Sequence, residues 1–112
     1  MIDLNNVELL ESLLLSDSGI IISLRMGDGL NTSLVDKVCE VLVELKDEWK
    51  VKDSIPKKAV DLFVDFYPAM ESCEGLYNKK EFTEILDAAD KIMNYIRAVS
   101  YTHLRAHETA AN

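Results

Sequence analysis

The segment NTSLVDKVCEVLVELKDEWK, residues 31–50, carries the clearest structural pattern in this chain of 112 residues. Its apolar side chains recur every three or four positions, at Leu34, Val38, Val41, Leu42, Leu45 and Trp49. That spacing places them on one face of an α-helix. Acidic residues occupy the opposite side, at Asp36, Glu40, Glu44, Asp47 and Glu48. The polar run 31–33 can cap the start, so the segment predicts an amphipathic helix that runs to about Lys50.

Segments on either side carry helical patterns of their own. Residues 5–15 combine an apolar stripe with a cap at Asn5 or Asn6, and Glu8 follows Asn5 at the spacing of a capping box. A third helix begins at Asp53 or Ser54 with Pro56 in its first turn, where the missing N–H costs nothing. This third helix is apolar nearly all round, which is typical of a central helix.

Pro68 and Asn78 are expected to mark the end of the third helix and the start of the last helix. Pro68 is expected to kink or end the third helix, although residues 69–73 allow a further helical piece. The last helix begins at Asn78, with Glu81 as its capping-box partner, and reaches at least Ala98. Its apolar face contains Phe82, Ile85, Leu86, Ala89, Met93 and Ile96.

Residues 20–24, IIISL, leave two possibilities open. Three β-branched residues in a row favour a strand locally, but no other segment offers a strand partner. We expect a short helix or a buried extended segment. The whole pattern predicts an all-α fold, a small antiparallel bundle of about four helices, as one domain over 1–98.

Residues 99–109 read VSYTHLRAHET and differ in kind from the rest of the sequence. They resemble, letter for letter, one translated frame of the transposase mosaic end and adapter of a Nextera sequencing library. We therefore expect 99–112 to be a non-native, adapter-derived tail and the native C-terminus after Ala98 to be truncated. Both histidines, His103 and His107, fall in this tail.

Composition excludes several chemistries. Residues 1–98 contain no histidine, which removes histidine-based catalysis and histidine-ligated zinc. The net charge of −8 disfavours nucleic acid and anionic membranes as partners.

Cys39 and Cys73 are expected to be free, buried thiols in a reducing cytoplasm, since no secretory signal precedes them. The Gly27-Asp28-Gly29 run predicts a turn. We expect no catalytic residue, cofactor or metal.

Paired carboxylates leave one enzymatic alternative open. Glu8 and Glu11, together with Asp87 and Asp90, resemble the ExxE and ExxD pairs of all-α nucleotide pyrophosphohydrolases of the MazG type. The resemblance implies magnesium held by carboxylates of two adjacent helices. Solvated helix charges are the alternative interpretation of these residues.

Other acidic and aromatic residues are candidates for partner binding. Glu40, Glu44, Asp47 and Glu48 form an acidic row that Trp49 adjoins. Asp61 and Asp65, one turn apart on the most apolar helix, either reach the surface or meet a cation such as Arg25. Tyr67 and Tyr77 lie at loop edges and, if exposed, would serve with Trp49 as anchors of an interface. Burial in the core is the alternative interpretation of these three aromatic residues.

The segments WKVKDSIPK, residues 49–57, and DLFVDFYPAME, residues 61–71, carry a resemblance that extends over about 30–97. In size, acidity and helical layout the chain resembles small helical immunity proteins encoded beside bacterial polymorphic toxins. The resemblance implies a non-enzymatic cytoplasmic protein that occludes a cognate basic toxin or another protein partner. A fragment of a helical adaptor or regulator is a further alternative.

Overall fold

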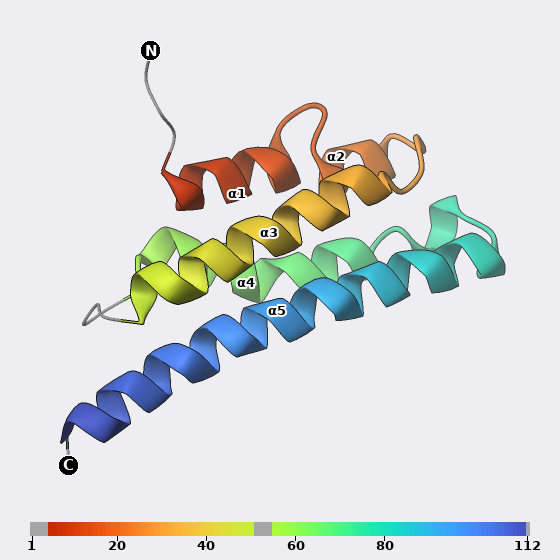
Figure 1. The fold of residues 1–112 in the computed structure, drawn as a ribbon. Helices are drawn as coiled ribbons and strands as arrows, with labels where there is room; N and C mark the ends of the chain where they lie inside the picture. The colour runs from red at the N-terminus through yellow and green to blue at the C-terminus, as the bar shows by residue number, and fades with distance from the viewer. Residues whose placement is uncertain (1–4, 51–54, 112) are drawn as a thin grey trace.

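A computed structural model describes the backbone of residues 5–50 and 55–111 and the side chains of 5–50 and 55–99. Over these ranges the fold is all-α, without strands (Figure 1). Four long helices and one short helix are present: α1 (Asn6–Leu15), α2 (Ile20–Arg25), α3 (Thr32–Trp49), α4 (Lys57–Glu71) and α5 (Lys79–Ala111). A 3₁₀ turn, Glu74–Leu76, precedes α5. The predicted small all-α bundle is confirmed.

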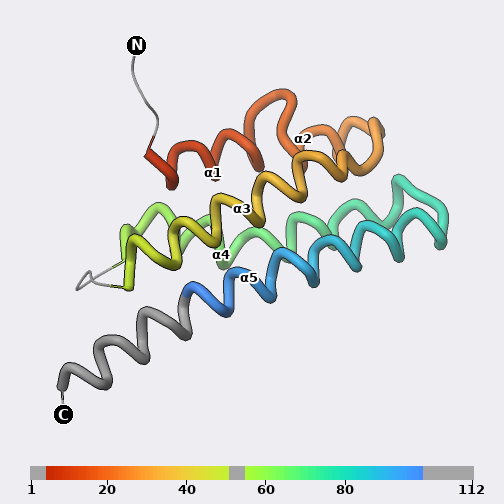
Figure 2. Tube along the Cα trace, viewed as in Figure 1, coloured from red at the N-terminus to blue at the C-terminus, as the bar shows by residue number. Residues whose placement is uncertain are grey.

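Successive long helices run in opposite directions, so α3 and α5 point the same way (Figure 2). The most extensive helix pair is α3 with α5, and α1 covers another side of α3. The helix α4 packs on α5 and touches α1 and α2 less. The expectation that the third helix is central is therefore wrong: α3 holds that place. On α4, Val60 and Val64 are 43% and 67% exposed, because no helix in the described ranges covers their side.

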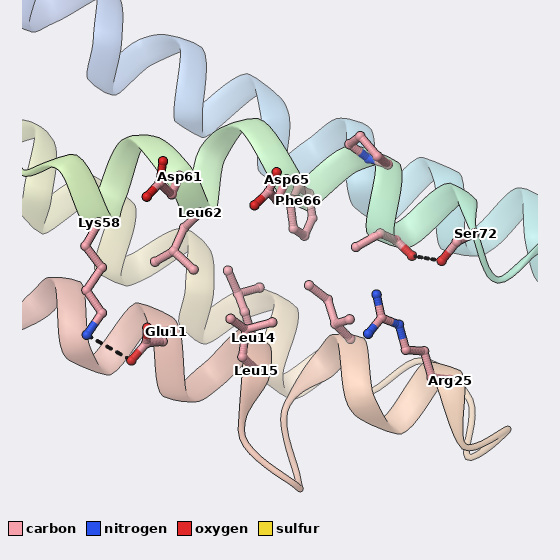
Figure 3. A pocket seen from close by; sticks show the side chains of 13 residues that line it. Glu11, Leu14, Leu15, Arg25, Lys58, Asp61, Leu62, Asp65, Phe66 and Ser72 are labelled. Atoms are coloured by element: carbon pink, nitrogen blue, oxygen red, sulfur yellow. Dashed lines mark hydrogen bonds and ion pairs between the residues drawn. The ribbon is translucent and has the colours of Figure 1, made fainter.

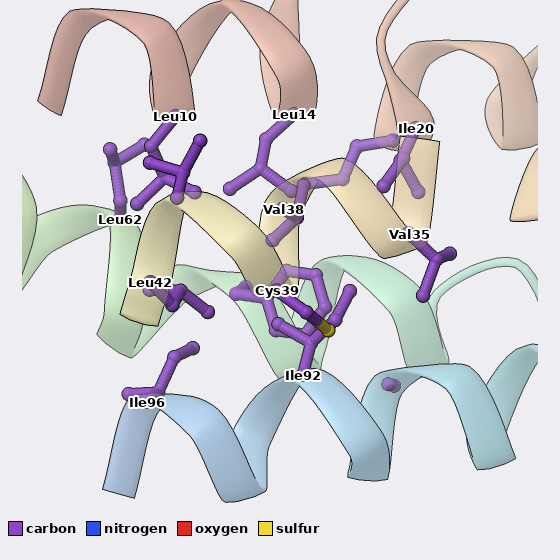
Figure 4. Close-up of a cluster of buried hydrophobic side chains, with 14 of the residues drawn as sticks. Leu10, Leu14, Ile20, Val35, Val38, Cys39, Leu42, Leu62, Ile92 and Ile96 are labelled. Carbon is purple, nitrogen blue, oxygen red and sulfur yellow. The ribbon is translucent and has the colours of Figure 1, made fainter. Parts of the chain in front are cut away.

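Every helix contributes to one continuous core (Figure 4). The fully enclosed side chains include Leu10, Leu24, Val38, Leu42, Phe66 and Ile92. Among the side chains described, none that is polar or charged is buried. Hydrophobic packing therefore stabilises the fold without the desolvation penalty of buried charges.

Local hydrogen bonds explain where the helices begin. The Asn5 side chain accepts from the Glu8 amide at 2.8 Å, and the Asn31 side chain accepts from the Leu34 amide at 3.2 Å. At the start of α5 the capping box is reciprocal, because Asn78 accepts from the Glu81 amide at 2.8 Å and Glu81 accepts from the Asn78 amide at 3.1 Å. The predicted caps at these three sites are confirmed.

Residues 20–24 are helical, which decides between the two expectations for this segment. Ile20, Ile21 and Leu24 are buried on the side that faces the core. The amides of Ser23 and Met26 donate to the carbonyls of Gly19 and Ile22, each at 3.0 Å, so the segment forms local backbone hydrogen bonds. A lone strand could not do this, and backbone pairing outweighs the β-branched preference of the isoleucines.

Pro68 lies inside α4 and does not end it, since the helix continues to Glu71. A proline at this position removes the amide that would donate to the Val64 carbonyl. Val64 is an exposed residue, so water can reach its carbonyl and the loss is moderate. Pro56 occupies the N-cap of α4, one position before the predicted first turn. The proposed caps Asp53 and Ser54 lie outside the described residues.

The backbone of α5 continues to Ala111, through the stretch that resembles adapter. Val99, the first residue of the adapter-like stretch 99–109, is 1% exposed. No helix in the described part of the chain is both long and apolar enough to cross a membrane.

Tyr77 ties two distant loops together. Its hydroxyl donates to the Leu24 carbonyl at 2.8 Å and accepts from the Gly29 amide at 3.0 Å. The contact joins the α2–α3 connection to the turn before α5. The positive φ of Gly29, 89°, suits glycine and directs its amide at the phenol.

Replacing Tyr77 with phenylalanine should lower the free energy of unfolding by about 1–2 kcal/mol, because two partly buried backbone groups lose their partner. Urea denaturation followed by circular dichroism measures this loss. Tyr95→Phe serves as the control, since the Tyr95 hydroxyl makes no hydrogen bond among the described residues. Equal stabilities of the two variants would contradict a structural role for the Tyr77 hydroxyl.

Candidate functional site

The acidic row predicted on residues 40–48 lies on the outer side of α3. Glu40, Glu44 and Asp47 are exposed, as expected for a helix whose opposite face is buried. Glu48 is exposed too, and its carboxylate accepts from the Asn6 side-chain amide at 3.0 Å. Three carboxylates therefore face solvent without a hydrogen bond or ion pair in the described structure, while the fourth helps to hold the start of α1.

Trp49 does not belong to this surface. Its side chain is 2% exposed and lies in the core beside Phe63, with ring centroids 6.2 Å apart and planes tilted by 57°. The tilted arrangement is a favourable aromatic pairing. Of the two interpretations of Trp49, a core residue of the α3 stripe or an exposed anchor, the structure supports the core residue, because the stripe extends to this position and buries it.

The two tyrosine candidates lie apart from the acidic row. The hydroxyl of Tyr77 makes the hydrogen bonds to the backbone of Leu24 and Gly29 described above. Tyr67 is half-buried on α4, and its pKa is raised by partial burial and then by the negative charges of Asp90 and Glu71. The structure therefore does not gather Tyr67, Tyr77 and Trp49 around the carboxylates of α3.

Asp61 and Asp65 instead line a groove between α4 on one side and α1 and α2 on the other (Figure 3). This groove has a volume of about 620 Å³. Its base is apolar, formed by the buried residues Leu14, Ile21, Leu62 and Phe66, and Leu15 lies exposed at its edge. Its rim is charged, formed by Glu11, Arg25, Lys58, Asp61 and Asp65.

The charges on this rim are unevenly compensated. Lys58 pairs with Glu11 at 3.0 Å and joins α4 to α1. Asp61 and Asp65 are both exposed, and neither has an ion-pair partner among the described residues. Arg25 lines the same groove without forming a salt bridge to them. Of the two sequence interpretations, surface exposure of Asp61 and Asp65 is therefore the one that the structure supports.

The two carboxylate pairs that suggested magnesium lie on different helices, α1 and α5, which share no extensive contact. Glu8 and Glu11 are on α1, whereas Asp87 and Asp90 are on α5, across the bundle with α3 between them (Figure 1). Glu11 is also engaged by Lys58. Within the described residues, no three His, Cys, Asp or Glu side chains come together in a group that could hold a metal ion. The geometry thus gives the pyrophosphohydrolase alternative no assembled carboxylate site.

Both cysteines are free and buried, as predicted. Burial is the main cause that raises the pKa of each thiol above its ordinary value of 9.0. For Cys39 the charge of Asp36 adds to the rise and that of Lys91 opposes it, while Arg25 opposes the rise at Cys73. Neither thiol has the lowered pKa of a reactive nucleophile.

These thiols predict alkaline sensitivity. Because the pKa is higher in the folded state, the folded protein retains protons that the unfolded chain loses, so stability is complete below pH 9 and falls as pH rises. Urea denaturation should give a lower free energy of unfolding at pH 10 than at pH 8. The Cys39→Ala/Cys73→Ala variant should lose less over this interval. An identical loss in both proteins would show that the thiols are not responsible.

Comparison of the chain with family models, curated proteins and solved structures gives no match. The surface chemistry of the bundle is therefore what bears on its function.

Proposed function

We propose that this chain is a non-enzymatic binding domain that uses the acidic side of α3 to occlude a basic protein partner. The single observation that carries the proposal is the set of exposed, uncompensated carboxylates Glu40, Glu44 and Asp47 on that helix. The partner we propose is a cognate bacterial toxin domain, neutralised in the cytoplasm as an immunity protein does. That finer identity rests on the resemblance over about 30–97.

The setting of α3 favours this use. The helix is packed on α1 and on α5, so its carboxylates are presented by a rigid element. Binding to a preorganised surface costs less conformational entropy than binding to a mobile one. The net charge of −8 has the same sign as the local surface and would accelerate encounter with a basic partner. Occlusion needs no catalytic group on this chain.

The test uses coexpression with the C-terminal domain encoded by the gene directly upstream. Growth rescue reports neutralisation, and stopped-flow kinetics with the purified domain report association. Replacing Glu40 and Glu44 by lysine should lower the association rate constant about tenfold or more at low salt, since steering depends on local charge. Both positions are exposed, so the variant should fold.

The matched control is Glu84→Lys/Asp87→Lys on α5, which changes the net charge equally on another helix. This control should retain most of the association rate. If both variants slow association by the same factor, net charge and not the α3 surface would be responsible. If the wild-type chain neither rescues growth nor binds, the proposal of a neighbouring toxin partner would be wrong.

A further inference from the structure

The groove between α4 and α1/α2 is a second surface with binding character, and no residue of α3 lines it. It is elongated along α4, from the Lys58–Glu11 ion pair at one end to Arg25 and Ser72 at the other (Figure 3). Asp61 and Ser72 are separated by about 16 Å along the helix, at 1.5 Å per residue. This length corresponds to about three turns of a helix laid beside α4.

The base of the groove would favour an apolar occupant. Leu15 is 44% exposed at its edge, while Leu14 and Phe66 close it from below. The helices α1 and α4 make only a narrow contact, and the contact between α2 and α4 is equally narrow. A groove between two weakly packed helices has the shape that a third helix fills, with apolar side chains at positions i, i+3, i+4 and i+7.

The rim specifies the charge of that occupant. Asp61 and Asp65 are one turn apart on the α4 side, and neither has an ion pair among the described residues. Two cationic side chains at i and i+4 of an opposing helix would match this spacing. Arg25 at the far end would favour the negative C-terminal end of the same helix. Lys58 already forms an ion pair with Glu11, so it does not require a charged partner from the occupant.

We propose that the groove binds an amphipathic helical segment of a protein partner, with lysine or arginine one turn apart at the edge of an apolar face. The C-terminus of the segment points toward Arg25, and its cationic edge faces Asp61 and Asp65. This site is separate from the acidic side of α3, so it does not depend on the toxin assignment. A partner that engages both surfaces would gain affinity by linking the two contacts.

The experiment uses the full chain and three fluorescein-labelled peptides of about four turns. The first has leucines at i, i+3, i+4 and i+7 and lysines along one edge; the second replaces these lysines by glutamate; the third scrambles the first. Fluorescence anisotropy at low and high salt gives each Kd. The lysine-edged peptide should bind at least tenfold more tightly than the other two, and salt should weaken this binding.

Variants assign the binding to the groove. Asp61→Asn/Asp65→Asn should raise the Kd of the lysine-edged peptide about tenfold, and Leu15→Asn should also raise it. All three positions are exposed, so these variants should keep the fold, which circular dichroism verifies. The control Glu84→Gln/Asp87→Gln removes two charges from exposed positions of α5, outside both proposed binding surfaces, and should leave the Kd within about twofold.

Three outcomes would overturn the proposal: no binding of the lysine-edged peptide to the wild-type chain, equal binding of the scrambled peptide, or equal weakening by the α5 control. The last outcome would indicate diffuse attraction to an acidic protein. Because the peptide experiment contains no toxin, its failure would not contradict the proposed neutralisation of a toxin. Conversely, failure of the growth-rescue experiment would not contradict the proposed binding of a helix in the groove.

Discussion

Replacing Phe66 with alanine is expected to lower the free energy of unfolding by about 3–5 kcal/mol, the largest effect of any single change considered for this chain. Phe66 is 1% exposed and is among the largest fully enclosed side chains. It lies on the buried side of α4 and lines the base of the groove, so its loss leaves a void next to the surface. Domains of this size have a total stability of about 5–15 kcal/mol, and the variant could therefore lose much of its folded population at 37 °C.

The matched control for Phe66 is Val64→Ala on the same helix. Val64 is 67% exposed, and alanine is a better helix former than valine, so this variant should match the wild type within about 0.5 kcal/mol. Urea denaturation and differential scanning calorimetry measure both changes. A loss below about 1 kcal/mol for Phe66→Ala would mean that α4 is not packed as described.

Replacing Gly19 with alanine is expected to cost about 2–3 kcal/mol, for steric reasons. A Cβ at this position would lie 2.8 Å from the carbonyl carbon and 2.9 Å from the carbonyl oxygen of Leu14. Both are backbone atoms at the end of α1, so no rotamer change relieves the contact. The turn between α1 and α2 would have to open, which moves Ile20 and Ile21 out of the core.

Gly75→Ala provides the comparison for Gly19. A Cβ at Gly75 meets nothing within 4 Å and its φ is not positive, so alanine should be neutral or stabilise by up to about 1 kcal/mol. Melting temperatures of the two variants separate a steric effect from a general effect of losing glycine. Equal melting temperatures would contradict the close approach of Gly19 to α1.

Much of the fold could be predicted because the decisive signals are local. The apolar stripe of residues 31–50 and the paired signals of Asn78 and Glu81 depend on residues within a few turns of each other. The buried face of α3 is rotated slightly from the predicted stripe, since Val35 and Cys39 are buried and Leu34 is only partly buried. That shift reflects the position of α5, which no pattern within α3 encodes.

The arrangement of the candidate surfaces depends on packing between distant segments and could be predicted only in part. The exposure of Glu40 and Glu44 follows from helical periodicity alone. The burial of Trp49 depends on Phe63, and the groove depends on how far α1 and α2 stand from α4. The sequence alone suggests a contact between Arg25 and Asp61, but Leu15 and Ile21 carry no local sign that they border the same groove.

The same-direction pairing of α3 and α5 has a consequence for how fast the chain folds. Residues that meet across this pair are far apart in sequence, as Asp36 and Lys91 show with a separation of 55 positions. The loop that closes when α3 docks on α5 contains all of α4. Closing such a long loop costs conformational entropy before the contacts between α3 and α5 form. The folding rate should therefore lie below that of helical hairpins of similar stability, whose contacts are local. Shortening the connection between α4 and α5 would change the folding rate more than the unfolding rate if that docking forms the nucleus.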